Sequence, residues 1–220
     1  MRLIKDILKM IFFPTRCTVC EKFCMRYLCE KCEKNLNQNF NTTIVNTLHK
    51  NVVCVSPFIY EGTVRKIIHN YKFKNQKNLY KVVSPFLSMS VLEKFKNEKF
   101  DLISSVPSLV RNSYEREYDH SSILGIELSK NLNIPYEYCI KKIKKNKAQH
   151  GLSFYERQEN VKGVYKSIKN YENKNILLCD DIITTGATLS ECVNQLTNSG
   201  ARVLCATVSY TLNPKNKDIK

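Results

Sequence analysis

The sequence predicts an α/β fold, in which a parallel sheet is flanked by helices and a small cysteine-rich module precedes it. Two observations carry this prediction. From about residue 51 onward, short β-branched runs alternate with segments whose apolar residues have helical spacing, which is typical of a parallel sheet. Before that point, four cysteines stand in two closely spaced pairs. We therefore expect two units, a module with its linker over 1–50 and an α/β domain over 51–220.

The elements are expected where the hydrophobic period changes. The polar stretch 36–51 is typical of a linker or an irregular edge. Strands are predicted at 52–60, 101–107, 136–146, 175–181 and 201–212, the third running into a basic loop. Helices are predicted at 61–73, 82–95, 120–132 and 184–200, the last ending at Gly200.

The composition is that of a soluble globular chain, because 43% of its 220 residues are hydrophobic and 25% are charged. The sequence has no run of about 18 apolar residues, so it does not predict an integral membrane protein. Residues 1–14 are apolar in patches that Lys5, Asp6 and Lys9 interrupt. We interpret them as a short packing helix rather than a secretory signal.

Two adjacent carboxylates, Asp180 and Asp181, follow an apolar strand and precede the turn Thr-Thr-Gly-Ala-Thr. Ligands of parallel sheets bind beyond the carboxyl ends of the strands. There the carboxylates offer acceptors for a diol, while the helix N-terminus and threonine hydroxyls offer donors for a phosphate. Gly186 lets the backbone approach a ligand closely. This combination predicts a ribose 5-phosphate site, which we prefer to an ordinary strand–turn–helix with incidental acids.

Residues 179–189, Cys-Asp-Asp-Ile-Ile-Thr-Thr-Gly-Ala-Thr-Leu, resemble the phosphoribosyl pyrophosphate (PRPP) loop of the type I phosphoribosyltransferases. The segment 144–165 is similar to one characteristic of the ComF family. The residues that recur there are Gln149, Leu152, Ser153, Arg157, Asn160 and Val161. The Val-Pro loop after 105 and the Tyr-Lys-Phe-Lys stretch at 71–74 extend this resemblance. With the cysteine-rich head, it covers nearly the whole chain and implies the type I phosphoribosyltransferase fold.

The resemblance implies a role for each matching residue. Asp180 and Asp181 would hold the ribose hydroxyls and be the catalytic pair. The 5-phosphate would be bound by Thr184, Thr185, Gly186, Ala187 and Thr188. The pyrophosphate, bridged by Mg²⁺, would meet Ser105, Val106, Pro107 and Ser108. The cations expected to neutralise it are Lys72, Arg111 and Arg116, for which a solvated surface charge is the alternative.

The chain departs from the family's pattern at two places. Residues 116–120 read Arg-Glu-Tyr-Asp-His where the family usually shows Arg-Gly-Phe-Asn-Gln, and Asn146 stands where threonine is frequent. The first change replaces a glycine by Glu117, which bears on the pyrophosphate contacts expected there. The loop 145–149 would be the mobile cover of this fold.

The cysteine-rich head has the spacing C-x₂-C-x₈-C-x₂-C, formed by Cys17, Cys20, Cys29 and Cys32. Two paired thiolates give the tetrahedral S₄ shell that a structural Zn²⁺ prefers. A redox dithiol would not explain two pairs, and we expect Cys24 to stay outside the shell. The remaining cysteines lie in apolar elements and are expected to be small core residues: Cys54, Cys139, Cys179, Cys192 and Cys205.

The net charge of +15 predicts attraction to polyanions, although a lysine- and asparagine-rich proteome would produce the same bias. Residues 141–147 carry five lysines in seven positions, with aromatic residues on both sides. Lysines follow phosphates and aromatic faces stack bases, so this run predicts single-stranded DNA binding, with covering the PRPP site as the alternative. The lysines are Lys141, Lys142, Lys144, Lys145 and Lys147.

The resemblance implies a ComF-like protein that binds Mg²⁺-PRPP and single-stranded DNA during DNA uptake in natural transformation. It implies a cytoplasmic location, including the inner face of the membrane, and a competence helicase or DNA-uptake channel as partner. One alternative is an active salvage or biosynthetic phosphoribosyltransferase with a nucleobase or amine acceptor. Another is a PRPP-sensing adaptor whose zinc head docks a partner. Catalysis stays open, because we find no recognisable acceptor-binding hood.

Overall fold

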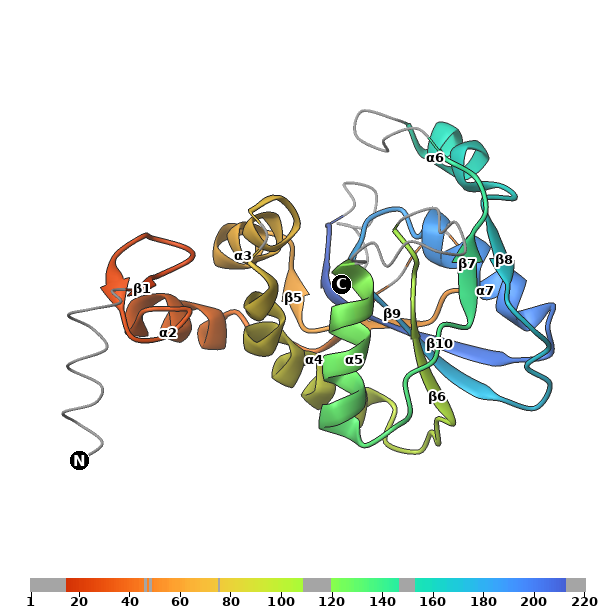
Figure 1. The fold of residues 1–220 in the computed structure, drawn as a ribbon, viewed down its shortest axis with the longest axis horizontal. Helices are drawn as coiled ribbons and strands as arrows, with labels where there is room; N and C mark the ends of the chain where they lie inside the picture. The colour runs from red at the N-terminus through yellow and green to blue at the C-terminus, as the bar shows by residue number, and fades with distance from the viewer. Residues whose placement is uncertain are drawn as a thin grey trace.

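A computed structural model describes residues 15–45, 47, 49–74, 76–108, 120–146 and 153–212. Within these residues, a six-stranded sheet forms the centre of the molecule (Figure 1). Its strands are β3 (Thr43–Val45), β4 (Cys54–Ser56), β5 (Phe58–Ile59), β6 (Leu102–Ser105), β9 (Asn175–Ile183) and β10 (Arg202–Tyr210). The order is β3-β4-β10-β9-β6, and β5 also pairs with β10.

The sheet is parallel except at one edge. β10 is parallel to β4, β5 and β9, and β9 is parallel to β6, which confirms the predicted parallel sheet. β3 is antiparallel to β4. It lies within the stretch expected to be a linker or an irregular edge, so part of that stretch is an edge strand of the sheet.

Helices cover both faces of the sheet. They are α3 (Gly62–Phe73), α4 (Tyr80–Lys94), α5 (His120–Leu132) and α7 (Ala187–Thr197), and each confirms a predicted helix. A short 3₁₀ turn, η1 (Lys77–Leu79), leads into α4. α4 and α5 pack together on one face, whereas α7 packs against β10 on the other. None of the described helices is long and apolar enough to cross a bilayer.

The long inner strands β9 and β10 bury both of their faces. Leu177 and Cys179 of β9 point into the core under α4 and α5, whereas Ile176 and Leu178 point into the core under α7. This alternation follows from the two-residue period of a strand, and burial on both faces explains the continuous apolar run. The cysteines expected in the core are all buried, and burial raises the pKa of Cys54 to about 12.

The N-terminal module lies at one end of the molecule and packs on α3 (Figure 1). It consists of strands β1 (Thr15–Arg16) and β2 (Phe23–Cys24) and of helix α2 (Glu30–Gln38). Thr63 Oγ1 of α3 donates to Asn35 Oδ1 of α2 at 2.6 Å, and the Asn70 amide donates to the Thr18 carbonyl. Buried residues of the module join the same core as α3 and α4.

A two-stranded antiparallel ribbon stands beside the sheet, formed by β7 (Ile140–Lys142) and β8 (Tyr165–Ser167). Helix α6 (Phe154–Val161) lies between these strands in sequence. The strand predicted at 136–146 is therefore shorter than expected and lies outside the main sheet. Its first residues still contact β6: Tyr136 and Ile103 form an isolated bridge, and Ser104 Oγ accepts the Cys139 N–H at 3.0 Å.

Candidate functional site

A cleft of about 600 Å³ opens at the carboxyl ends of β6 and β9. It is lined by Asp180 and Asp181, by the turn Thr184–Thr188, and by Val106, Pro107 and Ser108. The three groups predicted for the ribose, the 5-phosphate and the pyrophosphate thus share one cavity. Ser105 supports the cleft from behind, since its buried Oγ is hydrogen-bonded to the Tyr136 hydroxyl at 2.7 Å. Arg111 and Arg116 lie outside the described residues.

The acidic pair lies near the carboxyl end of β9, within the strand, which continues to Ile183. Successive side chains of a strand leave on opposite faces, so Asp180 and Asp181 differ in environment. Asp180 is half-buried, and its Oδ1 accepts the Asp181 N–H at 2.8 Å. Asp181 is only 5% exposed. A buried carboxylate needs a counter-charge, and the fold supplies one.

That counter-charge is Lys72, which α3 carries to the cleft. Its Nζ lies 2.8 Å from Asp181 Oδ2. Burial by itself would lower the pKa of Lys72, but the carboxylates of Asp181 and Asp180 outweigh burial and raise it. Lys72 is therefore a cation at neutral pH, and its charge offsets the repulsion between the two adjacent acids. Lys72 lines the cleft, as predicted, but the contact it makes is with Asp181, one of the acids predicted to hold the ribose, and not with the Val-Pro loop.

The turn Thr184–Thr188, predicted to bind the 5-phosphate and called the phosphate turn below, leads into α7. Its Gly186 has a left-handed conformation. Gly186 is the N-cap residue at φ +84°, and its carbonyl accepts the Ser190 N–H at 2.8 Å. Thr185 Oγ1 accepts the Ala187 N–H at 3.4 Å. The first turn of α7 contains no acidic residue, so the positive end of its dipole is not opposed there. These features suit an anion.

Replacing Gly186 is expected to cost stability, because its left-handed conformation disfavours a side chain and the space beside it is tight. A Cβ at Gly186 would lie 3.2 Å from Thr47 Cβ. We expect Gly186→Ala to weaken ribose 5-phosphate binding at least about tenfold and to lower the melting temperature, since left-handed strain costs about 1–3 kcal/mol. Isothermal titration calorimetry and thermal unfolding measure both effects.

Gly62→Ala is the matched control for this substitution. Gly62 also has a positive φ, +49°, but a Cβ there meets nothing within 4 Å. It should lose some stability and keep ribose 5-phosphate binding, because it does not line the cleft. Equal binding by the two alanine variants would contradict the role of the turn.

The lysines of 141–147 that were predicted to bind DNA do not all face the same way. Lys142 faces the cleft, and its Nζ donates to the Ser108 carbonyl at 3.2 Å. Lys141, its neighbour on β7, is exposed, as are Lys144 and Lys145. Lys147 lies outside the described residues. The structure therefore separates one cleft lysine from three surface lysines, a distinction that depends on strand alternation.

One contact with the phosphate turn was not expected from the sequence. It is made by Arg157, which belongs to the segment 144–165 that is similar to the ComF family. Arg157 Nη1 of α6 donates to Thr184 Oγ1 at 3.2 Å. A local signal for this helix exists in Ser153-x-x-Glu156, which forms a complete capping box. The position of the arginine over the turn depends on packing between distant segments, which no local pattern shows.

The four predicted cysteine ligands come together at the module. Their Sγ atoms all lie within 4.8 Å of one another, and Cys20 Sγ and Cys29 Sγ are 3.5 Å apart. Tetrahedral zinc with bonds of about 2.3 Å requires sulfur–sulfur separations of about 3.8 Å, so the cluster fits structural zinc. In the described part of the chain, this cluster excludes Cys24, whose thiol donates to the Arg26 carbonyl at 2.9 Å.

The parallel sheet, with a cleft at the carboxyl ends of its strands, has the type I phosphoribosyltransferase fold. In agreement, the family model described as "Phosphoribosyl transferase domain" matches residues 119–220. The chain is also 30% identical over 132 residues to "Competence protein F" of Haemophilus influenzae, covering 57% of this chain and 58% of that protein. It is 26% identical over 146 residues to "DNA utilization protein YhgH" of Escherichia coli K12, covering 64% of each. These matches confirm the resemblance to the ComF family.

The matched region spans less than two thirds of either of these relatives. Among solved structures, a crystal structure of adenine phosphoribosyltransferase aligns with 83% of this chain and 90% of its own, at 16% identity and a TM-score of 0.46. The adenine phosphoribosyltransferase of Saccharomyces cerevisiae aligns with 84% and 90%, at 15% identity and a TM-score of 0.44.

Proposed function

We propose that the chain binds PRPP together with Mg²⁺ in the cleft at the carboxyl ends of β6 and β9. The observation that supports this proposal most is that an acidic pair, a phosphate turn and the Val-Pro loop line one cavity. Each group complements one part of the ligand: carboxylates accept from ribose hydroxyls, the turn donates to the 5-phosphate, and the loop lies where a pyrophosphate would extend. Mg²⁺, when bound with the ligand, would supply positive charge that shields the pyrophosphate oxygens.

Two lysines complete the electrostatics of the cleft. Lys72 balances part of the negative charge of the acidic pair, because its cation lies 2.8 Å from Asp181. Lys142 brings a second cation beside Ser108, on the side of the Val-Pro loop. Cations beside an anionic ligand would strengthen its binding, and they would stabilise pyrophosphate if it departed.

Isothermal titration calorimetry of the zinc-loaded chain tests the proposal. PRPP with Mg²⁺ should bind saturably to one site, and ribose 5-phosphate should bind to the same site more weakly. Titration into a folded, zinc-loaded chain without any heat of binding would contradict the proposal. Release of pyrophosphate on addition of nucleobases or amines would show that the chain is an active phosphoribosyltransferase, the alternative with an acceptor substrate.

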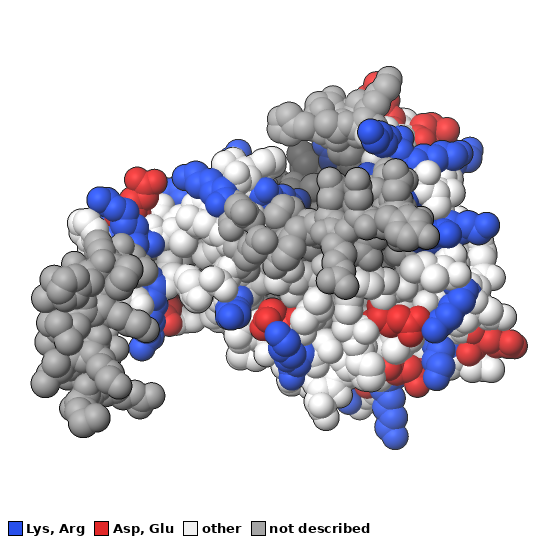
Figure 2. Space-filling model, viewed as in Figure 1, with Lys and Arg blue, Asp and Glu red and all other residues white. Residues whose placement is uncertain are grey.

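We also propose that the surface beside this cleft binds single-stranded DNA, as the names of the relatives suggest a role in DNA handling. Support comes from the net charge of +15 and from the exposed Lys141, Lys144 and Lys145 on the ribbon and its loop. On the face shown in Figure 2, basic side chains gather around the ribbon and α6, interspersed with acidic ones. A competence helicase or uptake channel remains the proposed protein partner.

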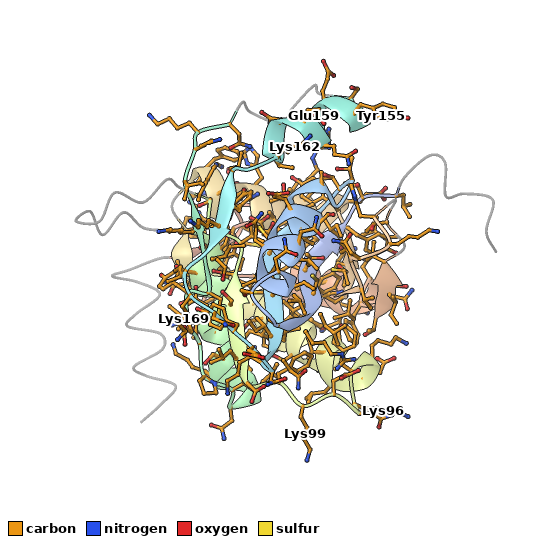
Figure 3. All side chains as sticks on the ribbon, turned by 90° about the vertical axis from the view of Figure 1, so that its right-hand side faces the viewer. Lys96, Lys99, Tyr155, Glu159, Lys162 and Lys169 are labelled. Carbon is orange, nitrogen blue, oxygen red and sulfur yellow. The ribbon has the colours of Figure 1, made fainter. Side chains whose placement is uncertain are left out.

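Salt dependence of oligonucleotide binding tests this second proposal. Lys144→Gln/Lys145→Gln should lower the slope of log K against log salt by about 1.4, because each phosphate contact on a single strand contributes about 0.7. Lys96→Gln/Lys99→Gln removes the same charge from the opposite end of the molecule (Figure 3) and should leave the slope nearly unchanged. Fluorescence anisotropy at several salt concentrations gives both slopes, and equal slopes would refute the assignment.

A further inference from the structure

Helix α6 stands over the phosphate end of the cleft, beside the ribbon from which it emerges (Figure 1). Its first turn is fixed by the capping box. The Ser153 N–H donates to Glu156 Oε2 at 2.7 Å, and the Glu156 N–H donates to Ser153 Oγ at 3.4 Å. Reciprocal capping satisfies N–H groups that a helix start otherwise leaves unpaired, so this short helix has a defined beginning.

The other end of α6 is anchored on α7. Val161, its last residue, is 2% exposed and belongs to the core under α7. The Gly163 N–H, just beyond the helix, donates to Glu191 Oε1 of α7 at 3.1 Å. Both contacts fix α6 to the helix that the phosphate turn begins.

Anchoring determines where Arg157 points. Arg157 precedes Val161 by four residues, so the two share one face of α6. Because Val161 faces the core under α7, Arg157 lies on the side of α6 toward the start of α7, and its Nη1 donates to Thr184 Oγ1 at 3.2 Å. Tyr155 lies on the outer face, 78% exposed, and points away from the body of the molecule (Figure 3).

The contact brings a cation to a turn whose own residues are neutral. Thr184, Thr185, Gly186, Ala187 and Thr188 offer only hydroxyl and N–H donors. Lys72 is engaged with Asp181, and Lys142 lies beside Ser108. A guanidinium carries five N–H donors in a planar fork that suits phosphate oxygens, so it can contact both a threonine hydroxyl and an anion.

We propose that Arg157 is a binding residue for the phosphate monoester of the ligand, brought to the turn by α6. This inference rests on the proposed function of the cleft and deepens it. Arg157 makes the site select ligands that carry a terminal phosphate on the sugar. Free pyrophosphate, which occupies the Val-Pro side, does not use this arginine.

Calorimetric titrations of the zinc-loaded full chain with ribose 5-phosphate and with Mg²⁺-pyrophosphate test the inference. Arg157→Gln should weaken ribose 5-phosphate binding about 10- to 100-fold, the range expected for a hydrogen bond to a charged group. It should change pyrophosphate binding less than about twofold. Arg157→Lys should give an intermediate loss, since an ammonium keeps the charge but loses the fork.

Lys162→Gln provides the matched control. Lys162 directly follows α6, its side chain is 75% exposed, and it lies 3.9 Å from Glu159 on the surface. Removing this charge alters the electrostatics of the same helix end without touching the cleft, so both affinities should be retained. Loss of ribose 5-phosphate affinity in Arg157→Gln and Arg157→Lys, with retention in Lys162→Gln, supports the inference.

Two results would overturn it while leaving the cleft's function intact. One is unchanged ribose 5-phosphate affinity in Arg157→Gln, and the other is an equal loss for ribose 5-phosphate and pyrophosphate. The lysine variant keeps the test decisive if the glutamine variant does not fold. If the wild-type chain bound neither ribose 5-phosphate nor Mg²⁺-PRPP, the proposed function itself would fall, and the role of Arg157 with it.

Discussion

Asp180→Asn/Asp181→Asn is expected to abolish PRPP binding in a chain that still folds. Each carboxylate would accept a charge-assisted hydrogen bond from a ribose hydroxyl, worth about 1.5–3 kcal/mol. Losing both therefore lowers affinity about 10²- to 10⁴-fold. The amides keep the size of the side chains, so the shape of the cleft is preserved. Titration of Mg²⁺-PRPP into the wild-type and variant chains measures the loss.

The two single variants should differ in stability. Asp181 is 5% exposed and pairs with Lys72 at 2.8 Å, so Asp181→Asn leaves the half-buried Lys72 ammonium without its carboxylate. It should lower the melting temperature more than Asp180→Asn, whose side chain is half-buried. Asp101→Asn serves as the control for PRPP affinity, which it should retain. Asp101 accepts the Asn175 N–H at the opposite end of β9, away from the cleft.

Undiminished PRPP affinity in the double variant would refute the assignment of the acidic pair.

Removing zinc should unfold the N-terminal module and destabilise the domain behind it. Structural zinc contributes about 10–16 kcal/mol of apparent binding free energy in small zinc peptides, so the module should have no folded state without it. Two of its cysteines, Cys17 and Cys32, share one core with α3 and α4. Loss of the module therefore exposes part of the core of the domain, and the melting temperature should fall.

Metal analysis and thermal unfolding, before and after treatment with a chelator, check this expectation. One zinc per chain and a lower melting temperature after chelation are expected. Cys17→Ser should lose the metal. Cys24→Ser should retain it, because Cys24 lies outside the cluster and a serine can still donate to the Arg26 carbonyl. A module whose structure and stability survive complete removal of zinc would contradict a structural role for the metal.

Most of the fold follows from periodicity in the sequence. Helix α5 has the predicted bounds, and α3 begins one residue later than predicted, because their apolar residues repeat at helical spacing. Strands β9 and β10 were predicted since both faces are buried and the run is continuously apolar. The antiparallel edge strand β3 and the pairing of β7 with β8 in a separate ribbon do not follow from the pattern, because three-residue strands carry too few residues to show one.

The candidate site also contains a part that the sequence predicts and a part that depends on packing. The acidic pair and the phosphate turn are contiguous, so a short string of residues predicts their chemistry. The contacts of Lys72 with Asp181 and of Arg157 with Thr184 join residues 109 and 27 positions apart. The sequence names these basic residues through motifs, but their partners depend on how α3 and α6 pack. A run of lysines likewise does not show which of them faces the cleft, and the structure places Lys142 there.

Helix α3 has a consequence for how the two sites of the chain depend on each other. Asn70 donates to the Thr18 carbonyl in the loop that carries Cys17 and Cys20, and Lys72, two residues later, pairs with Asp181 in the cleft. If removing the metal destabilises the position of α3, it also displaces Lys72. The affinity of a ligand that needs Lys72 would fall by a corresponding free energy. Thermodynamic linkage makes this coupling reciprocal, so an occupied cleft tightens the metal by the factor that the metal tightens the ligand. Zinc at the four-cysteine cluster would then act on the affinity of the cleft as well as on the stability of the module.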